Sequence, residues 1–365
     1  MQGTIALTFL TSLVIVILAT PALIKVSYLK RLVDEPGEER KLHKRRVPTI
    51  GGIMIFAATL FSYLMWYPLD TKLDILKLEA AFRDFKYIGA SMIILFFVGV
   101  KDDIIGTAPL KKLVGHLIVA FILVIMGDIK ITSMHGLLGL EGLNEWASIF
   151  LSVFTYTVIV NAFNLIDGVD GLAAGVGSIV CLACGIWFFY AGGIQHSILA
   201  FALAGSLIGF LVFNFNPAKI FMGDSGSLTI GLIVSVLCIK LIEFDHQNLP
   251  GNFSNISTPV FAMAVLSYPL MDTLRIFIYR AARGVSPFSA DRNHMHHILL
   301  DAGGFNHKQT VMCIYAYNLF MIFCAAFLVP DDPTLAFGLI LVIAVVATQI
   351  PIFFLKRKAK KRALR

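Results

Sequence analysis

Long apolar runs recur along the whole chain, separated by short polar stretches. A membrane-spanning helix requires about 20 mainly apolar residues, and eleven runs reach or approach this length. They cover residues 4–24, 50–67, 87–100, 113–127, 147–163, 171–191, 196–213, 228–243, 259–279, 309–329 and 334–355. The pattern predicts an all-α, polytopic integral membrane protein with about 11 transmembrane helices, forming a single transmembrane domain over residues 1–365.

Basic residues are concentrated in alternate connections between these runs. The segments that follow the odd-numbered runs hold 23 Lys and Arg, whereas those on the opposite face hold 5. Connections rich in Lys and Arg stay in the cytoplasm, and an odd number of spans places the two termini on opposite sides. We therefore expect the N-terminus outside, the C-terminus in the cytoplasm, and a basic cytoplasmic tail over residues 356–365.

Composition agrees with a bilayer environment. The chain of 365 residues is 58% hydrophobic and 15% charged, whereas soluble domains carry about 25% charged residues; its mean hydropathy is +0.81. The net charge of +7 comes largely from clusters within 25–46 and 356–365, which flank apolar runs. Such clusters favour anionic lipid as the partner, so we expect contact with the lipid bilayer and no nucleic acid.

Polar motifs gather in the five internal connections assigned to the cytoplasm. They read HKRRVPTIGG (43–52), KDDIIG (101–106), NAFNLIDGVDGL (161–172), FNFNPAKIFMGDSGS (213–227) and SPFSADRNHMHH (286–297). The connections on the other face carry nothing comparable. Because all five lie on one side of the membrane, the sequence predicts a single polar site there.

Two pairs of aspartates stand out. Asp102 and Asp103 are adjacent at a predicted helix exit, and neighbouring carboxylates raise each other's pKa unless a cation compensates; a solvated helix end is the alternative. Asp167 and Asp170 are three residues apart beside glycines, so both can point to one side as the next helix begins. For Asp170 a helix N-cap is the alternative.

Asp224 occurs in Gly-Asp-Ser-Gly just before a predicted helix, where small residues let backbone amides approach an anion. A helix cap is again the alternative. Carboxylate and amide oxygens suit Mg²⁺ or Mn²⁺, and these ions usually bind through one or two protein ligands plus substrate phosphates. No motif resembles a closed zinc site.

A histidine tract, His294-Met295-His296-His297, follows Arg292. Imidazole and guanidinium groups donate hydrogen bonds to phosphate or sugar oxygens, although a surface cluster or an adventitious metal site is the alternative. For the basic stretch and the following residues at 44–52, the alternative to a role in the site is a lipid-facing anchor. Taken together on one membrane face, carboxylates, basic side chains and histidines indicate a site for a metal-bound diphosphate.

The five motifs, in this order and spacing, resemble the polyprenyl-phosphate N-acetylhexosamine-1-phosphate transferases, a glycosyltransferase 4 type family, over roughly residues 25–310. The tract within 287–297 is similar to the branch that transfers GlcNAc-1-phosphate, whose pattern is Asp-Arg-x-His-Ile-His-His, with Met295 here in place of isoleucine. A rival branch is the phospho-MurNAc-pentapeptide transferases, which carry a different triple-histidine tract.

The resemblance implies roles for individual residues. Asn164 and Asp224 resemble the metal ligands, Asp102 and Asp103 the catalytic pair that handles the lipid phosphate, and Asp167 a further catalytic acid. The implied substrate-binding residues contact phosphates, uracil, pyrophosphate or sugar. They are Lys44 and Thr49 for phosphate, Lys112 for the lipid phosphate, Asp170 for uracil, and Arg292, His294, His296 and His297 for pyrophosphate and sugar.

The implied reaction transfers GlcNAc-1-phosphate from UDP-GlcNAc to undecaprenyl phosphate with Mg²⁺ or Mn²⁺, releasing UMP and initiating a cell-envelope glycan. The expected location is the bacterial inner membrane with a cytoplasmic active site, and a homodimer is an open alternative for the assembly. A secondary transporter is a rival of another class, but it would hold polar residues on discontinuous helices near mid-bilayer. Few charges lie mid-span. The main candidates, Asp272 and Arg275, sit near the cytoplasmic end, where an i,i+3 ion pair in a broken helix explains them. No HExxH motif supports a metalloprotease.

Overall fold

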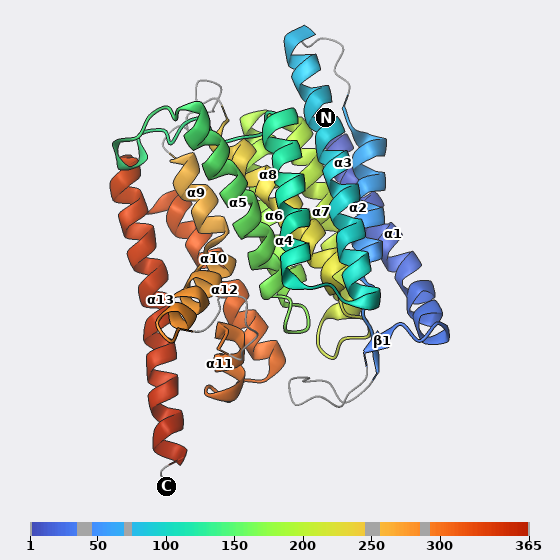
Figure 1. Cartoon of the computed structure of the whole chain (residues 1–365), viewed down its shortest axis with the longest axis vertical. Coiled ribbons are helices and arrows are strands. Elements are labelled where there is room, and N and C mark those ends of the chain that lie inside the picture. The colour runs from blue at the N-terminus through green and yellow to red at the C-terminus, as the bar shows by residue number, and fades with distance from the viewer. Residues whose placement is uncertain (1, 35–45, 69–74, 245–255, 285–292, 364–365) are drawn as a thin grey trace.

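The computed structural model describes residues 2–34, 46–68, 75–244, 256–284 and 293–363. Helices dominate the described chain and run roughly along one common direction (Figure 1). The elements are α1 (Gln2–Leu29), β1 (Val33–Asp34), β2 (Val47–Pro48), α2 (Gly52–Trp66), α3 (Ile75–Ile105), α4 (Pro109–Phe121), η1 (Ile122–Met126), η2 (Leu137–Gly139), α5 (Glu145–Leu165), α6 (Leu172–Ala191), α7 (Ile194–Asn214), α8 (Gly223–Ile242), α9 (Thr258–Val265), α10 (Ser267–Ala281), α11 (Met295–Asp301), α12 (His307–Phe327) and α13 (Pro333–Ala363).

Each of the eleven apolar runs lies in a helix or a pair of consecutive helices, so the all-α polytopic membrane class is confirmed. Within the described ranges, eight helices are long and apolar enough to cross a membrane, and the bent pair α9 and α10 makes up to nine. Helix α2 is shorter, and α3 carries Lys86 and Lys101 around its apolar stretch. The count of eleven therefore stays a prediction.

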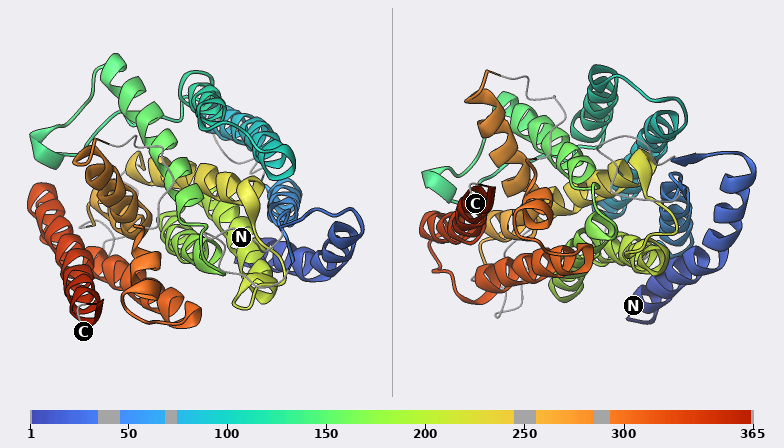
Figure 2. Two further views of the ribbon diagram at one scale, coloured as in Figure 1. Left: turned by 60° about the horizontal axis from the view of Figure 1, so that its bottom comes forward. Right: turned by 90° about the horizontal axis from the view of Figure 1, so that it is seen from below.

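Helix α8 forms the centre of the bundle. All of its residues from Ser225 to Ile239 are buried, as expected for a helix that is apolar all round. It packs chiefly on α3 and α5, which flank it in the view from below (Figure 2). Small residues permit these crossings, because a Cβ added at Gly99 would lie 2.5 Å from the Cα of Ser225. The polar start of α8 is thereby fixed at one end of the bundle.

The segment before α2 meets the segment before α8 at this same end. β1 and β2 form a two-stranded antiparallel pair. Beyond β2, Phe221 N donates to Pro48 O at 2.7 Å and Gly52 N donates to Met222 O at 2.7 Å. Backbone groups thus tie the Thr49 region to Gly223 and Asp224.

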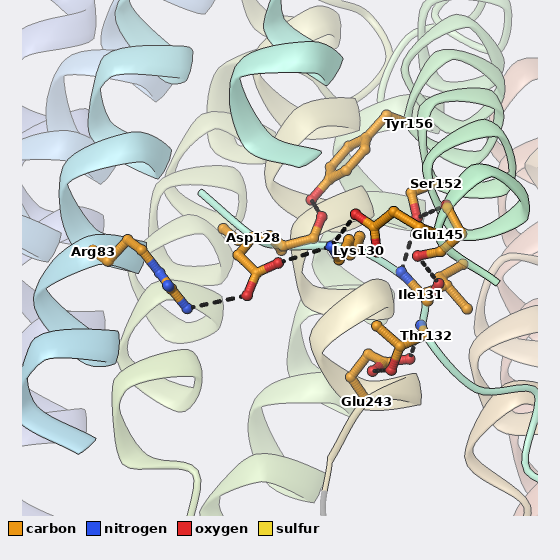
Figure 3. Close-up of polar contacts among 11 residues, drawn as sticks. Arg83, Asp128, Lys130, Ile131, Thr132, Glu145, Ser152, Tyr156 and Glu243 are labelled. Atoms are coloured by element: carbon orange, nitrogen blue, oxygen red, sulfur yellow. Dashed lines mark hydrogen bonds and ion pairs between the residues drawn. The ribbon is translucent and has the colours of Figure 1, made fainter. Parts of the chain in front are cut away.

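At the other end of the bundle, ion pairs hold the irregular segment between η1 and α5 (Figure 3). Asp128 pairs with Arg83 at 3.4 Å and with Lys130 at 3.1 Å, and Lys130 also pairs with Glu145 at 2.8 Å. Nearby, Lys240 of α8 lies 2.5 Å from Asp84 of α3. These contacts anchor the end of α8 that lies a full helix length away from Asp224.

One of the C-terminal apolar runs differs from the sequence expectation. The run 259–279 is broken at Leu266 into α9 and α10, which are bent by 73°. The run 334–355 continues as α13 to Ala363, so residues 356–363 of the expected basic tail are helical. Apolar side chains such as Phe327 and Val342 are exposed on α12 and α13, as expected for surfaces facing lipid.

Candidate active site

A lysine bridges two of the predicted site aspartates. Lys112 Nζ on α4 lies 2.9 Å from Asp102 Oδ2 at the end of α3 and 2.5 Å from Asp224 Oδ2 in the first turn of α8. All three side chains are about one-fifth exposed or less, so the charges are partly withdrawn from water. One ammonium group therefore joins carboxylates that are 122 residues apart in the chain.

Asp103 points to the start of α8 rather than to Lys112. Its Oδ1 accepts a 2.6 Å hydrogen bond from Asp224 N, and its Oδ2 accepts a 3.1 Å hydrogen bond from Ser225 N. These are orphan N–H groups of a helix start. Burial raises the pKa of Asp103 to about 6, although these N–H donors favour its ionised form. Of this adjacent pair, Asp102 thus binds the Lys112 side chain, and Asp103 binds the start of α8.

Asp224 does not cap α8, which excludes the alternative of a helix cap. The helix begins at Gly223, its N-cap position is Met222, and Asp224 lies in the first turn. Gly223 has a φ of +70°, and a side chain there would collide with the carbonyl of Thr49 and the carboxylate of Asp103. The glycine therefore lets Thr49, a predicted phosphate contact, lie directly against the acidic cluster.

Asn164 lies at the end of α5 and faces the same turn of α8. Its Nδ2 lies 3.0 Å from Ser227 Oγ, and its side chain also hydrogen-bonds the carboxylate of Asp224. The two residues predicted as metal ligands are therefore neighbours. Ser227, which sequence reasoning did not single out, orients the amide of Asn164; its place in the Gly-Asp-Ser-Gly-Ser motif was the available signal.

Asp167 is half-buried in the connection between α5 and α6. Its withdrawal from water, and after that the charge of neighbouring carboxylates, raises its pKa well above the ordinary value. These neighbours are Asp224, Asp103 and Asp170. The concentration of negative charge is therefore a property of this site, as the sequence predicted for paired carboxylates.

Asp170 does not cap the following helix, which excludes that alternative. The N-cap of α6 is Gly171, without a side-chain cap. The Oδ2 of Asp170 instead accepts hydrogen bonds from Asn216 Nδ2 at 2.8 Å and from Ala218 N at 3.0 Å. Asp170 thus links two of the polar connections, and Asn216 is a partner that the sequence alone did not reveal.

The histidine tract begins α11 and reaches the α5–α6 connection. A Cβ added at Gly168 would lie 3.0 Å from His296 Nε2, so the imidazole lies against this glycine. Burial lowers the pKa of His296 to about 3, which leaves the ring neutral. The rings of His294 and His296 stack with centroids 5.4 Å apart, and His297 lies 4.4 Å from His296. The tract is thus a packed group, not an exposed cluster.

Asp272 and Arg275 of α10 support the tract. They form the i,i+3 ion pair expected from the sequence, at 3.5 Å. Asp272 also binds His294, a contact for which the sequence held no signal beyond a carboxylate within an apolar run. Two predicted substrate-binding residues, Lys44 and Arg292, lie outside the described residues.

The acidic residues fit a divalent metal in their chemistry. Where the structure describes the chain, no group of three or more His, Cys, Asp or Glu side chains is arranged to hold an ion. Mg²⁺ however needs only one or two protein ligands when substrate phosphates complete its shell. Asp224 contributes a carboxylate and the neighbouring Asn164 contributes an amide, and both groups carry the hard oxygen atoms that Mg²⁺ prefers. These residues would hold Mg²⁺ or Mn²⁺.

Comparison with known proteins agrees with this site. Residues 85–242 match glycosyl transferase family 4, a stretch that runs from α3 to the end of α8. The decaprenyl-phosphate N-acetylglucosaminephosphotransferase of Mycolicibacterium smegmatis is 32% identical, over 86% of this chain and 80% of its own. Its namesake in Mycobacterium tuberculosis H37Rv is 32% identical, over 95% and 89%.

A second group of relatives comes from enterobacteria. The undecaprenyl-phosphate alpha-N-acetylglucosaminyl 1-phosphate transferase of Salmonella typhi is 29% identical, over 84% of this chain and 78% of its own. Identity and coverage of this extent, together with the convergence of the family's polar motifs at one end of the bundle, establish the relationship. The chain belongs to the polyprenyl-phosphate N-acetylglucosamine phosphotransferases of glycosyl transferase family 4, multi-pass membrane enzymes that transfer a sugar phosphate to a polyprenyl phosphate.

Proposed function

We propose that the protein transfers GlcNAc-1-phosphate from UDP-GlcNAc to undecaprenyl phosphate, giving GlcNAc-diphospho-undecaprenol and UMP and so initiating a cell-envelope glycan. The observation that carries this proposal is the Lys112 bridge between Asp102 and Asp224. It joins a carboxylate assigned to the acceptor phosphate with one assigned to the donor diphosphate. Acceptor and donor phosphates would therefore meet around a single ammonium group.

The donor would lie between the start of α8 and the histidine tract. Thr49 and the tract residues would contact its phosphates and sugar, while Asp170 would contact uracil. Two contacts of the α5–α6 connection support this placement: Asp170 accepts hydrogen bonds from the 216–218 connection, and His296 lies against Gly168. Bound Mg²⁺ or Mn²⁺ at Asp224 and Asn164 would neutralise charge on the donor diphosphate.

The chemical step is a single displacement. An oxygen of the lipid phosphate attacks the β-phosphorus of UDP-GlcNAc, the bond from that phosphorus to the bridging oxygen breaks, and UMP leaves with the electron pair. A phosphate monoester has a second pKa of about 6, so the attacking group is already largely dianionic at neutral pH. Lys112 and Asp102 would orient it, and the histidine donors would stabilise charge on the transferred group.

The proposed acceptor is a polyprenyl phosphate, the class of acceptor for which both groups of relatives are named. The mycobacterial relatives are named for decaprenyl phosphate and the enterobacterial ones for undecaprenyl phosphate. Both names specify a polyprenyl phosphate and an N-acetylglucosamine phosphate. We assign undecaprenyl phosphate because the histidine tract is similar to the branch that uses it, and we propose decaprenyl phosphate as the competing acceptor in the test.

The proposed topology has eleven spans in the bacterial inner membrane, with the N-terminus outside and the catalytic end in the cytoplasm. Two observations support it: the two termini lie toward opposite ends of the bundle (Figure 1), and the catalytic connections carry most of the Lys and Arg. A cytoplasmic site is also where a nucleotide sugar would be supplied.

The test is turnover of the purified protein in detergent with three donors, UDP-GlcNAc, UDP-GalNAc and UDP-MurNAc-pentapeptide, and two acceptors, undecaprenyl phosphate and decaprenyl phosphate. UMP release should be fastest with UDP-GlcNAc and undecaprenyl phosphate in the presence of Mg²⁺. UDP-GalNAc should be a weaker donor, because one inverted hydroxyl forfeits about one hydrogen bond of 0.5–1.5 kcal/mol. Preference for UDP-MurNAc-pentapeptide, or uptake of a solute into vesicles without UMP formation, would refute the proposal.

A further inference from the structure

Asp272 is a fully buried carboxylate that the proposed chemistry does not use. It lies on α10, beyond the break at Leu266, and its side chain has no solvent exposure. An ionisable residue buried at this depth is costly unless it is paired, and in membrane proteins it usually marks a functional region. The partners of Asp272 therefore indicate its role.

The partners of Asp272 all belong to the start of the histidine tract or support it. Asp272 Oδ2 lies 2.7 Å from His294 Nδ1, and Asp272 Oδ1 accepts a 2.7 Å hydrogen bond from Met295 N. One turn further on, Arg275 donates to the carbonyl of Asn293 and pairs with Asp272. Asp272 and Arg275 of α10 thus bind three consecutive residues: the carbonyl of Asn293, the ring of His294 and the N–H of Met295.

These contacts continue to the catalytic cluster through ring packing. The His294 ring, held by Asp272, stacks on His296 with an interplanar angle of 11°. His296 Nδ1 lies 3.3 Å from the hydroxyl of Tyr268, also on α10, and its Nε2 faces Gly168 beside Asp167. Displacing the Asp272 carboxylate would therefore disturb the orientation of the tract against the α5–α6 connection.

We propose that Asp272 is a positioning residue for sugar-phosphate transfer. It holds His294 as the tautomer with hydrogen on Nδ1, and through the stacked rings it fixes the tract in the geometry needed for the donor pyrophosphate. A carboxylate behind an imidazole selects its tautomer and leaves the second nitrogen for the substrate. This inference rests on the proposed function for its kinetic readout, but its structural part does not.

The kinetic test compares Asp272→Asn with Asp84→Asn. The Asp272→Asn amide keeps the size of the side chain but has a single acceptor oxygen for two donors, so either His294 Nδ1–H or Met295 N–H then faces an N–H group. We expect kcat to fall by about 10- to 100-fold, with the KM for UDP-GlcNAc changed little, because the oriented histidines would act mainly on the charge that develops on the transferred group in the transition state. Asp84→Asn is the matched control: it removes another buried carboxylate, paired with Lys240 at the far end of α8, and should lower the melting temperature without lowering kcat.

A double-mutant cycle separates positioning from a general structural role. If Asp272 acts through His294, the variant that combines Asp272→Asn with His294→Gln should be about as slow as His294→Gln alone. Independent losses would instead multiply, since unlinked effects add in free energy. Multiplied losses, or a kcat for Asp272→Asn equal to that of Asp84→Asn, would overturn the proposal.

A measurement on the wild-type protein needs no variant. Histidine ¹⁵N spectra in detergent should show His294 carrying hydrogen on Nδ1, and a bare Nδ1 with hydrogen on Nε2 would overturn the inference. This readout is independent of the donor. An inactive wild-type enzyme with UDP-GlcNAc would thus refute the proposed function, whereas the wrong tautomer would refute only the role of Asp272.

Discussion

Asp103 at the end of α3 accepts a 2.6 Å hydrogen bond from the backbone N–H of Asp224, 121 residues further along the chain. Its second oxygen accepts from Ser225 N. A carboxylate from one helix therefore caps the start of another. Because Asp224 also binds Lys112, the cap, the lysine bridge and the proposed metal ligand form one connected unit.

Removing this cap should cost stability. Asp103→Ala leaves two N–H groups of α8 without their acceptor, and the loss of an N-cap carboxylate lowers the free energy of unfolding by about 0.5–2 kcal/mol. Thermal melting in detergent should show a lower transition temperature. Asp102→Ala is the matched control, because Asp102 binds the Lys112 side chain and not a helix start. Equal melting temperatures for the two variants would contradict the capping role.

Neutralising the bridge should impair catalysis. Lys112→Gln removes the positive charge shared by Asp102 and Asp224, and loss of one preorganised donor at a site of developing charge reduces kcat by about 100- to 1,000-fold. Steady-state UMP release measures the effect. Lys111→Gln provides the control, since Lys111 is exposed on the same helix and its loss should change kcat by about twofold or less. Similar rates for both variants would remove Lys112 from the site.

The Mg²⁺ dependence of turnover should require Asp224. Chelation of divalent ions should abolish turnover, and Mg²⁺ should restore it. Asp224→Asn should abolish turnover and weaken the Mg²⁺-dependent binding of UDP-GlcNAc in calorimetry, while the protein still folds because Asp102 retains Lys112. The control Asp128→Asn alters a half-exposed carboxylate at the far end and should behave as the wild type. Near-normal turnover of Asp224→Asn at ordinary Mg²⁺ would end the assignment.

Sidedness can be measured with single cysteines in a background lacking the five native ones. Lys308→Cys, at the exposed start of α12, should be protected from an impermeant thiol reagent in intact cells. Glu141→Cys, exposed in the segment between η2 and α5, should be labelled from outside. The reverse pattern would invert the proposed topology and place the catalytic end outside.

The nucleophile can be identified by withholding the acceptor. If the lipid phosphate attacks directly, enzyme stripped of polyprenyl phosphate should neither release UMP from UDP-GlcNAc nor exchange labelled UMP into it. A covalent route through Asp102 would instead expose an acyl phosphate near water, where hydrolysis competes. A stoichiometric burst of UMP without lipid, with labelled sugar phosphate retained on the protein, would establish that route.

From the pattern of apolar runs and polar connections, the sequence predicted the class of fold and a set of candidate site residues. Apolar runs of bilayer length must become helices because backbone polar groups have no other partners in lipid, and each of the eleven runs does lie in helical structure. The same reasoning confines charged residues to the ends of helices. This is why Asp102, Asp167 and Asp224 were identifiable from their position beside apolar runs, before any contact between them was known.

How these residues pair follows from helix packing, which the residue pattern along the chain does not specify. Nothing local distinguishes Lys112 from Lys111, yet one faces Asp224 and the other is exposed. Likewise, Asp272 could be read as the partner of Arg275 alone, because an i,i+3 contact follows from helix geometry, whereas its bond to His294 does not. Contacts between helices depend on close crossings such as Gly99 against Ser225, and packing of this kind is set by the shapes of distant segments rather than by the pattern along one of them.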